Sequence, residues 1–252
     1  MAAQNKRADP GGPGGRQPEA SLWERLERPA PTPRNTLTPA TLAEAAVRIA
    51  DAEGMQAVTM RRLATELRVA PMAAYRHVSG KDDLWALMVD RVAVELVVPD
   101  EVTGWREVLR EMALRTRRTT LAHPWLTTVP APLSLLTPHR IAAAERQIAA
   151  LDGHGLDADT LMVAFRTVNA YVQGAVQAEV ALRAYMDEQG WASGDDIRLG
   201  LAPTMKWLMG TDRYPVYGAT LRALRRRDDP AWEFATGLDC VLDGLAARLG
   251  LP

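Results

Sequence analysis

The chain has 252 residues, a hydrophobic share of 47%, one cysteine and a formal net charge of −1. This length and composition allow the core of one large or two modest domains. The sequence contains no apolar run long enough to span a membrane and no recognisable signal peptide, and Cys240 has no partner for an internal disulfide. We therefore expect a cytoplasmic protein, in which charge has to be considered segment by segment.

The first 36 residues contain six prolines and four glycines. Such a composition buries too little apolar surface to offset the entropy of ordering. We therefore predict a disordered extension over residues 1–36, with a short helical turn near Leu22–Leu26. Its basic residues outnumber its acidic residues by six to four. A flexible basic arm of this kind either grazes DNA or is simply solvated, and the sequence leaves both open.

The chain after Thr38 shows helical periodicity throughout. Threonine, serine or proline stands at the predicted helix starts, and glycine or proline follows the ends. Ser79 and Asp82 predict a capping box for the fourth helix, which Pro99 ends. The first four predicted helices cover about 39–53, 59–67, 71–78 and 80–98.

The remainder of the chain is also predicted to be helical. Four prolines between residues 124 and 138 indicate a loop with one short turn, and residues 188–196 indicate a second loop. No segment alternates apolar and polar residues as a strand would, so the predicted fold class is all-α. The predicted helices are 105–122, one that ends near 151, 157–187, 197–209, 216–227 and 231–249.

Helices 59–67 and 71–78 are separated by about three residues, which is the spacing of a helix-turn-helix. The segment Thr59–Lys81 contains five basic residues and one acidic residue, whereas the flanking residues 36–58 and 82–98 are mainly acidic. A positive field focused on one segment favours phosphate binding. The spacing alone is also compatible with a helical hairpin of another kind.

Small residues in the third predicted helix give this hypothesis a physical basis. A recognition helix enters a major groove about 12 Å wide, and small side chains allow its backbone to approach base edges. Lys81 stands at the next helix start, where backbone amides and a lysine together can hold a phosphate. The small residues are Ala70, Ala73 and Ala74, and the polar residues beside them are Tyr75, Arg76 and His77.

The segment TLAEAAVRIADAEGMQAVTMRRLATELRVAPMAAYRHVSGKDDLWALMVD, residues 41–90, resembles the DNA-binding domain of TetR-type transcriptional regulators. The lead EG…VTMRRLA…L and the close Y-x-H-V-x-x-K, with the leucine after it, support the resemblance. It implies a three-helix, helix-turn-helix DNA-binding domain over residues 37–83. The family's DNA-contacting positions correspond here to Met60, Arg61, Pro71, Met72, Ala73, Tyr75, Arg76, His77 and Lys81.

The resemblance also implies a role for six of these positions. Tyr75 and His77 would hold backbone phosphates, with Lys81 and Arg61 nearby, and Arg61 is a candidate for a base contact as well. Met72 would face base edges together with its neighbour at position 73. Because position 73 lacks the polar side chain that often reads a base, methyl contacts to thymine are favoured there.

The turn departs from the family pattern at two positions. Arg68 stands where glycine is usual, and Ala70 stands where a serine or threonine cap is usual. We predict a left-handed or altered turn at Arg68, which costs about 1 kcal/mol. The missing cap at Ala70 costs about as much.

Residues 105–249 resemble, more weakly, the C-terminal domain of the tetracycline repressor and its relatives. The pieces that carry this resemblance are WREVLREMALRTRRTTLAHPWL, ERQIAALDGHGLDADTLMVAFRTVNAYVQGAVQAE, DRYPVY and WEFATGLDCVLDGLAARL. It implies that residues 84–252 bind a small inducer and form a homodimer through helices 157–187 and 231–249. The last helix has a wide apolar face, which a dimer or the monomer's own core would bury. A dimer also places two recognition helices about 34 Å apart on a palindromic operator.

The inducer is the least determined part of the hypothesis. Positions that hold tetracycline in the namesake correspond here to Val97, Met112, Thr116 and Gln147, and only the glutamine is kept. We expect a largely apolar ligand with one or two polar groups, and no tetracycline–metal complex. A stripe of such residues at helical spacing is more often core than pocket. The candidate ligand-binding residues are Met112, Thr116, Trp125, Gln147, Met162, Phe165 and Asn169.

Enzyme chemistry has little support in the sequence. The four histidines are scattered, there is no cysteine cluster, and PGGPGG precedes no Lys-Ser/Thr helix. We therefore predict no catalytic residue, metal site or cofactor, and a buried, inert thiol at Cys240. The leading hypothesis is a homodimeric, ligand-responsive DNA-binding regulator, most often a repressor in this family. The alternatives are a helical protein-interaction module without DNA binding and an α-helical enzyme.

Overall fold

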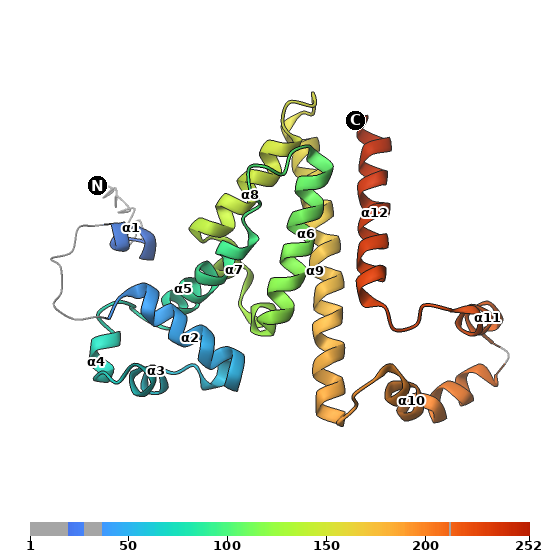
Figure 1. Ribbon diagram of the computed structural model, residues 1–252, viewed down its shortest axis with the longest axis horizontal. Helices are drawn as coiled ribbons and strands as arrows, with labels where there is room; N and C mark the ends of the chain where they lie inside the picture. The colour runs from blue at the N-terminus through green and yellow to red at the C-terminus, as the bar shows by residue number, and fades with distance from the viewer. Residues whose placement is uncertain (1–19, 28–36, 212) are drawn as a thin grey trace, which may run out of the picture. The chain divides into compact units, whose positions relative to one another are not determined.

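The computed structural model describes residues 20–27, 37–211 and 213–252. All regular structure in these residues is helical (Figure 1), which confirms the predicted all-α class. The chain divides into two units, Met1–Leu37 and Thr38–Pro252. None of the described helices is long and apolar enough to cross a membrane. The disorder predicted for residues 1–36 falls mostly on 1–19 and 28–36, which lie outside the described residues.

The first unit contains helix α1, Leu22–Glu27, at the place of the helical turn predicted near Leu22–Leu26. The backbone N–H of Ser21 donates to Oε2 of Glu24 at 2.7 Å, and the N–H of Glu24 donates to Oγ of Ser21 at 3.2 Å. This reciprocal pair is a capping box, which satisfies two N–H groups that a helix start leaves without partners.

The second unit begins with a small helical bundle. Thr38 and Thr41 form a capping box at the start of its first helix, α2 (Pro39–Glu53). Helix α2 packs against α3 (Met60–Leu67) and α5 (Lys81–Ala93), and α3 also packs against α4 (Pro71–Ala74). The core of the bundle contains Leu42, Leu63 and Met88, each 0% exposed. The elements are α2 Pro39–Glu53, η1 Met55–Ala57, α3 Met60–Leu67, α4 Pro71–Ala74, α5 Lys81–Ala93 and η2 Val94–Leu96.

Helices α6, α8, α9 and α12 of the rest of the chain surround a separate core. Helices α6, α9 and α12 pack against one another (Figure 1), and Trp105, Leu109, Val168, Leu238 and Leu242 are buried between them. The elements are α6 Trp105–Ala122, η3 Pro124–Thr128, α7 Ala131–Leu135, α8 Pro138–Leu151, α9 Ala158–Gln189, α10 Gly194–Met209, α11 Pro215–Ala223 and α12 Pro230–Leu249.

Two helices in the DNA-binding segment differ from the prediction. Helix α4 ends at Ala74, and the chain reaches His77 through i→i−3 bonds, including His77 N–H to the Ala74 carbonyl at 3.1 Å. The capping box predicted for Ser79 and Asp82 is wrong by one residue. Gly80 is the N-cap, so the Ser79 N–H donates instead to Oδ2 of Asp83 at 2.8 Å.

Helix α10 begins at Gly194, earlier than the predicted 197, because Ser193 and Asp196 form a capping box. That pair lies inside the loop predicted for residues 188–196.

The structure also contradicts the prediction for Cys240, whose thiol is exposed on α12 rather than buried. The apolar face of α12 that packs on α9 contains Phe234, Leu238 and Leu242, and the thiol lies outside it.

Candidate DNA interface and ligand cavity

The turn between α3 and α4 has the left-handed geometry that the sequence predicted. Arg68 has φ 54° and ψ 41°, and among the described residues no other non-glycine residue has a positive φ. The N–H of Val69 donates to the carbonyl of Ala64 at 3.0 Å, so the end of α3 remains hydrogen-bonded. Ala70 provides no side-chain cap for α4, also as predicted. The helix-turn-helix therefore forms without the usual glycine and cap.

Helix α4 presents two different faces. Met72 is 71% exposed and Tyr75 is 49% exposed, whereas Ala74 is 0% exposed and Val78 is 2% exposed. Ala74 therefore allows α4 to pack closely on its own domain, and the expectation that it brings the backbone to base edges was wrong. Ala73 is half-buried at the edge between the faces. The solvent-facing side contains Met72 and Tyr75, two of the residues expected at DNA.

Adjacent arginines on α3 have opposite environments. The guanidinium of Arg62 donates to Oε1 of Glu53 at 2.7 Å and to Oε2 of Glu66 at 2.9 Å. Hydrogen bonding to Glu53 and then Glu66 raises the pKa of Arg62, and the same bond lowers the pKa of Glu53. Arg61 is exposed, and within the described part of the chain no carboxylate pairs with it. Arg61 is therefore the arginine of this pair whose charge remains available to an anion.

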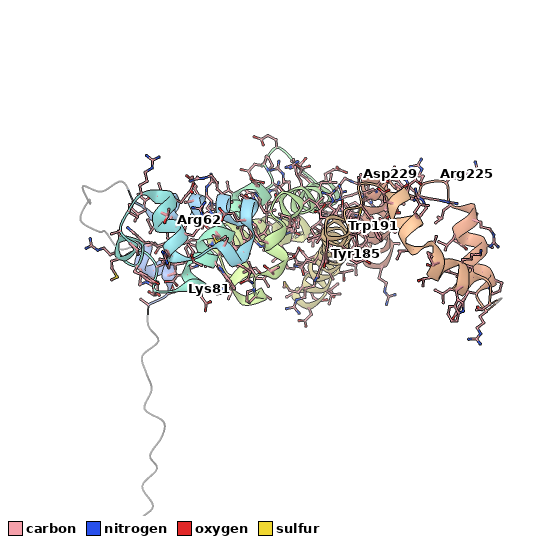
Figure 2. All side chains as sticks on the ribbon, turned by 90° about the horizontal axis from the view of Figure 1, so that it is seen from below. Arg62, Lys81, Tyr185, Trp191, Arg225 and Asp229 are labelled. Carbon is pink, nitrogen blue, oxygen red and sulfur yellow. The ribbon has the colours of Figure 1, made fainter. Side chains whose placement is uncertain are left out.

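Lys81 starts α5 on the same segment, and Figure 2 shows it and Arg62 on the helix-turn-helix part of the molecule. Its Nζ lies 4.3 Å from the centre of the Trp85 ring, which holds the ammonium over an aromatic face. The start of α5 has no side-chain cap, and its first-turn amides lie beside the lysine in a turn that also contains Asp82 and Asp83. Pro71, Arg76 and His77 complete the set of residues proposed from the sequence, with Met60 half-buried at the start of α3.

Two adjoining cavities lie within the C-terminal helices. One has a volume of about 310 Å³ and is lined from α5, η2, α6, η3, α7, α8 and α9. The other has a volume of about 380 Å³ and shares lining residues with the first. Cavities of this size suit a drug-sized ligand. The shared residues, where the two lobes meet, are Leu96, Thr116, Leu135, Arg140 and Gln173.

Five of the seven residues proposed as ligand contacts line these cavities: Met112, Thr116, Gln147, Phe165 and Asn169. The other two do not line either lobe. Trp125 is 5% exposed and its indole N–H donates to Oδ1 of Asp51 at 2.7 Å.

Met162 instead packs against the core that α6, α9 and α12 share. The polar residues of the second lobe are linked to each other. Nδ2 of Asn169 donates to Oε1 of Gln147 at 3.2 Å and to the carbonyl of Phe165 at 2.8 Å.

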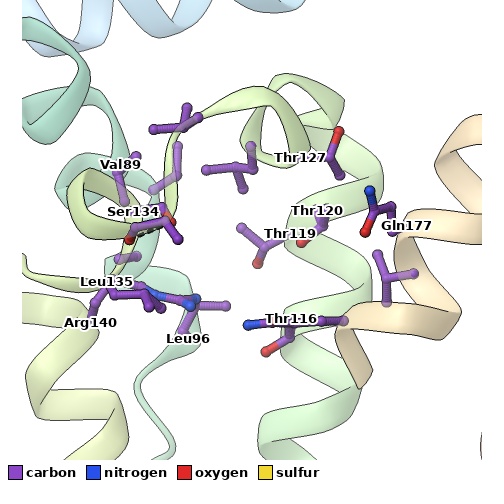
Figure 3. A pocket seen from close by; sticks show the side chains of 17 residues that line it. Val89, Leu96, Thr116, Thr119, Thr120, Thr127, Ser134, Leu135, Arg140 and Gln177 are labelled. Atoms are coloured by element: carbon purple, nitrogen blue, oxygen red, sulfur yellow. Dashed lines mark hydrogen bonds between the residues drawn. The ribbon is translucent and has the colours of Figure 1, made fainter. Parts of the chain in front are cut away.

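Sequence reasoning missed the arginine that lines both lobes. Figure 3 shows Arg140 with Ser134 and Leu135 on one side of the cavity, opposite Thr116, Thr119 and Thr120. Burial lowers the pKa of Arg140, because no neighbouring acid compensates its charge. The signal was present in the sequence as a single charge in the mainly apolar stretch TPHRIAAA. A charge alone in such a stretch is more common on a solvated helix face, so the cavity had to be seen first.

Two polar contacts join the cavity wall to the DNA-binding helices. Nδ1 of His123 lies 2.8 Å from Oδ1 of Asp51 on α2, the same oxygen that accepts from Trp125. At the start of α8, the N–H of His139 donates to Oδ1 of Asp90 at 2.9 Å, and its Nδ1 lies 2.8 Å from Oδ2. Asp90 is on α5. Trp125 and His139, one residue from each contact, directly precede the lining residues Leu126 and Arg140 in the sequence.

A helix-turn-helix with exposed basic residues, joined to a helical domain with an internal cavity, defines the class of ligand-responsive DNA-binding regulators. Residues 42–88 match the family model of bacterial regulatory proteins of the tetR family, and residues 98–249 match the tetracyclin repressor-like C-terminal domain. The chain belongs to the TetR family and is a DNA-binding transcriptional regulator with a ligand-binding domain.

Known proteins similar to this chain agree with that assignment. HTH-type transcriptional repressor DrrR1 of Streptomyces coeruleorubidus is 33% identical over 226 residues, which span 89% of this chain and 83% of the relative. An HTH-type transcriptional regulator of Saccharopolyspora erythraea is 31% identical over 255 residues, 100% of both chains. The crystal structure of the Streptomyces coelicolor TetR family protein ActR in complex with actinorhodin has a TM-score of 0.68 at 27% identity and covers 84% of this chain and 97% of that one.

Proposed function

We propose that this chain is a repressor that binds a palindromic operator as a homodimer in the cytoplasm. A small, largely apolar ligand in the cavity of Figure 3 then releases it from DNA. The observation that carries the proposal is the helix-turn-helix, in which Arg61, Met72, Tyr75 and Lys81 are all exposed. Exposed apolar and aromatic side chains beside basic ones suit base edges flanked by phosphates.

The outer faces of α9 and α12 support homodimer formation. Exposed positions there are small, with Gly174 and Ala178 on α9 and Cys240 and Gly244 on α12. A side chain added at Gly174 or Gly244 would meet no atom within 4 Å in its own chain. Small residues at a spacing of four allow helices of two subunits to approach closely, as a four-helix bundle requires.

Helices α10 and α11 provide a second argument for a partner copy. Helix α10 has no buried residue. Leu199 is 73% exposed, Trp207 is 69% exposed and Val216 is 78% exposed, so this segment leaves a large apolar surface uncovered. Apolar patches of this kind mark interaction surfaces. A second copy of the chain is the partner that the two-fold symmetry of a palindromic operator also requires.

The contacts of Asp51 and Asp90 offer a route from ligand to DNA. Leu126 and Thr127 line the first lobe directly after Trp125, which holds Asp51 on α2. Arg140 lines both lobes directly after His139, which holds Asp90 on α5. A ligand that fits one arrangement of this wall better than another therefore biases the positions of α2 and α5, and only such differential binding shifts the equilibrium.

A gel shift with DNA from upstream of the chain's own gene, together with fragments enriched from the genome, tests the proposal. We expect a shift at low salt that weakens steeply as salt is added, because phosphate contacts release counterions. If no fragment shifts at low salt, the regulator that we propose does not bind DNA as argued. A helical protein-interaction module would give that result.

A further inference from the structure

We propose that the ligand of the two-lobed cavity is an organic anion, an apolar or aromatic skeleton with one carboxylate that pairs with Arg140. This inference rests on the proposed function of the cavity as the ligand site. The two lobes meet at Arg140, so an acidic group bound there leaves apolar space on both sides for the rest of the molecule.

The first support is the charge of the lining. Arg140 and Arg166 are the charged residues among those that line the lobes in the described part of the chain, and neither lobe is lined by a carboxylate. Arg166 is exposed and lines one lobe only. A cavity with uncompensated positive charge and apolar walls attracts an anion and repels a cation.

The second support is the state of the Arg140 guanidinium. Within the described residues no hydrogen bond or ion pair holds it, and burial is the cause of its lowered pKa. Arg140 is half-buried, and a charge partly removed from water in this way is ordinarily paired, because the removal costs free energy that a partner offsets. An arginine fork is also the group that matches a carboxylate in two parallel hydrogen bonds.

Two acids on elements that form this wall, Asp90 on α5 and Glu95 in η2, are hydrogen-bonded to other residues. Both carboxylate oxygens of Asp90 are occupied by His139. Glu95 accepts from Oγ1 of Thr119 at 3.1 Å through its Oε2 atom. In the described residues neither acid forms an ion pair with Arg140, so a bound carboxylate is the remaining partner of suitable charge.

The third support is the position of Arg140 in the first turn of α8. The N-terminal end of a helix favours negative charge, because its first backbone N–H groups have no partners within the helix. The first turn of α8 has no acidic residue, and the arginine stands there instead. The N-terminal end of α8 and the Arg140 guanidinium thus both favour an anion that comes from outside the chain.

A free amide in the lining would complete the recognition, because two of the lining hydroxyls are already bonded within the chain. Thr116 bonds to Sδ of Met112 at 3.7 Å, and Ser134 bonds to the Ala131 carbonyl at 3.1 Å. Gln173 lines both lobes, and in the described residues its amide has no hydrogen bond. We expect this amide to meet a second polar atom of the ligand, which is a weaker requirement than the carboxylate.

Binding of three matched probes to the full-length protein tests the inference. The probes are anthracene-2-carboxylate, anthracene-2-carboxamide and 2-(aminomethyl)anthracene, which share a skeleton and differ in charge. Titration followed by probe fluorescence gives the Kd of each. We expect the carboxylate to bind at least about tenfold more tightly than the carboxamide, the range of a hydrogen bond to a charged group. The ammonium probe should bind most weakly.

Variants connect the preference to one residue. Arg140→Met should weaken carboxylate binding about tenfold or more and leave the carboxamide Kd nearly unchanged. Arg140→Lys should restore part of the preference, and Arg166→Met should leave it intact. The unliganded Arg140→Met protein should be at least as stable to heat as the original, because an unpaired, half-buried charge is lost. A large fall in its Tm would instead assign Arg140 a structural role and overturn the inference.

The remaining outcomes separate this inference from the proposed function. Equal or tighter binding of the carboxamide would overturn the anionic ligand but leave the cavity as a ligand site. If no probe binds while the protein still shifts its upstream DNA, the cavity does not take an aromatic acid, and the DNA-binding half of the proposed function stands. Release of that DNA by the carboxylate probe but not by the carboxamide would support both.

Discussion

The helix-turn-helix and the ligand cavity are built in different ways. The DNA-binding surface comes from consecutive elements, α3, α4 and the start of α5, so short spacings in the sequence place its side chains. The cavity wall is assembled from elements between α5 and α9. Local spacing fixes the direction of a side chain on its own helix, but the packing of several helices decides what that side chain faces. Site prediction from sequence is therefore sharper for the first surface than for the second.

The largest expected effect tests whether the DNA-binding surface works without the distant dimer face. Gly244→Arg places a long charged side chain on the outer face of α12, where nothing in the same chain lies within 4 Å. We expect a folded monomer by light scattering and a loss of operator affinity of about 100-fold or more, because bivalent binding is lost. Ala149→Arg, on an exposed position of α8, is the matched control and should remain dimeric.

Cys240 provides an independent measurement of the same face. It is the chain's single cysteine and is exposed in the isolated subunit. If α9 and α12 form the dimer, its reaction with a thiol reagent should be slow in the original protein and fast in Gly244→Arg. Equal rates in the two proteins, with both dimeric by light scattering, would place the interface elsewhere.

The next effect tests communication between the two regions. Asp51→Asn keeps the size of the side chain but removes the charge that the His123 ring and the Trp125 indole N–H share. We expect amide hydrogen exchange in the last turns of α2 to become about tenfold faster, because a hydrogen bond to a charged group is lost there. Amide exchange in α12 should not change. The control Asp152→Asn, at an exposed acid outside the contacts of Asp51 and Asp90, should change exchange in neither α2 nor α12. Unaltered exchange in α2 would show that this contact does not hold the DNA-binding helices.

The next prediction, with a smaller effect, concerns which arginine of α3 contacts a DNA phosphate. Arg61→Ala should lower the slope of log affinity against log salt by about 1, as expected for one lost phosphate contact. Arg62→Ala should leave that slope unchanged and lower the Tm, because Arg62 is already paired with Glu53 and Glu66. Fluorescence anisotropy at several salt concentrations separates the two. Equal changes of slope in both variants would mean that the ion pairs on α3 open on DNA.

Arg61 and Arg62 show which features of the DNA-binding segment could be predicted from the sequence and which could not. The sequence predicted the all-α class, the left-handed Arg68 and the two-helix unit of the DNA-binding surface, because caps, glycines and apolar spacing are local signals. The ion pair of Arg62 with Glu53 depends on the packing of α3 against α2, which no local pattern specifies. The buried Ala74 depends on packing in the same way.

The ligand domain shows the same limit more strongly. Met112, Thr116 and Gln147, on α6 and α8, were placed at the cavity because the family resemblance aligned them. Arg140 was missed because nothing local distinguishes it from a solvated arginine. Trp125 was expected in the lining, but its hydrogen bond to Asp51 comes from a helix far away in the chain. Long-range contacts of this kind required the structure.

The smallest expected effect concerns the left-handed turn at Arg68. Arg68→Gly should stabilise the protein by about 1 kcal/mol, because glycine adopts φ 54° without the steric cost that an arginine bears. For a chain of this length the Tm should rise by about 3 °C. Arg68→Ala is the control, since it removes the charge but keeps a side chain in the left-handed region, and its Tm should not rise. A similar rise in both variants would mean that charge repulsion, rather than backbone strain, is the cost of having arginine in this turn.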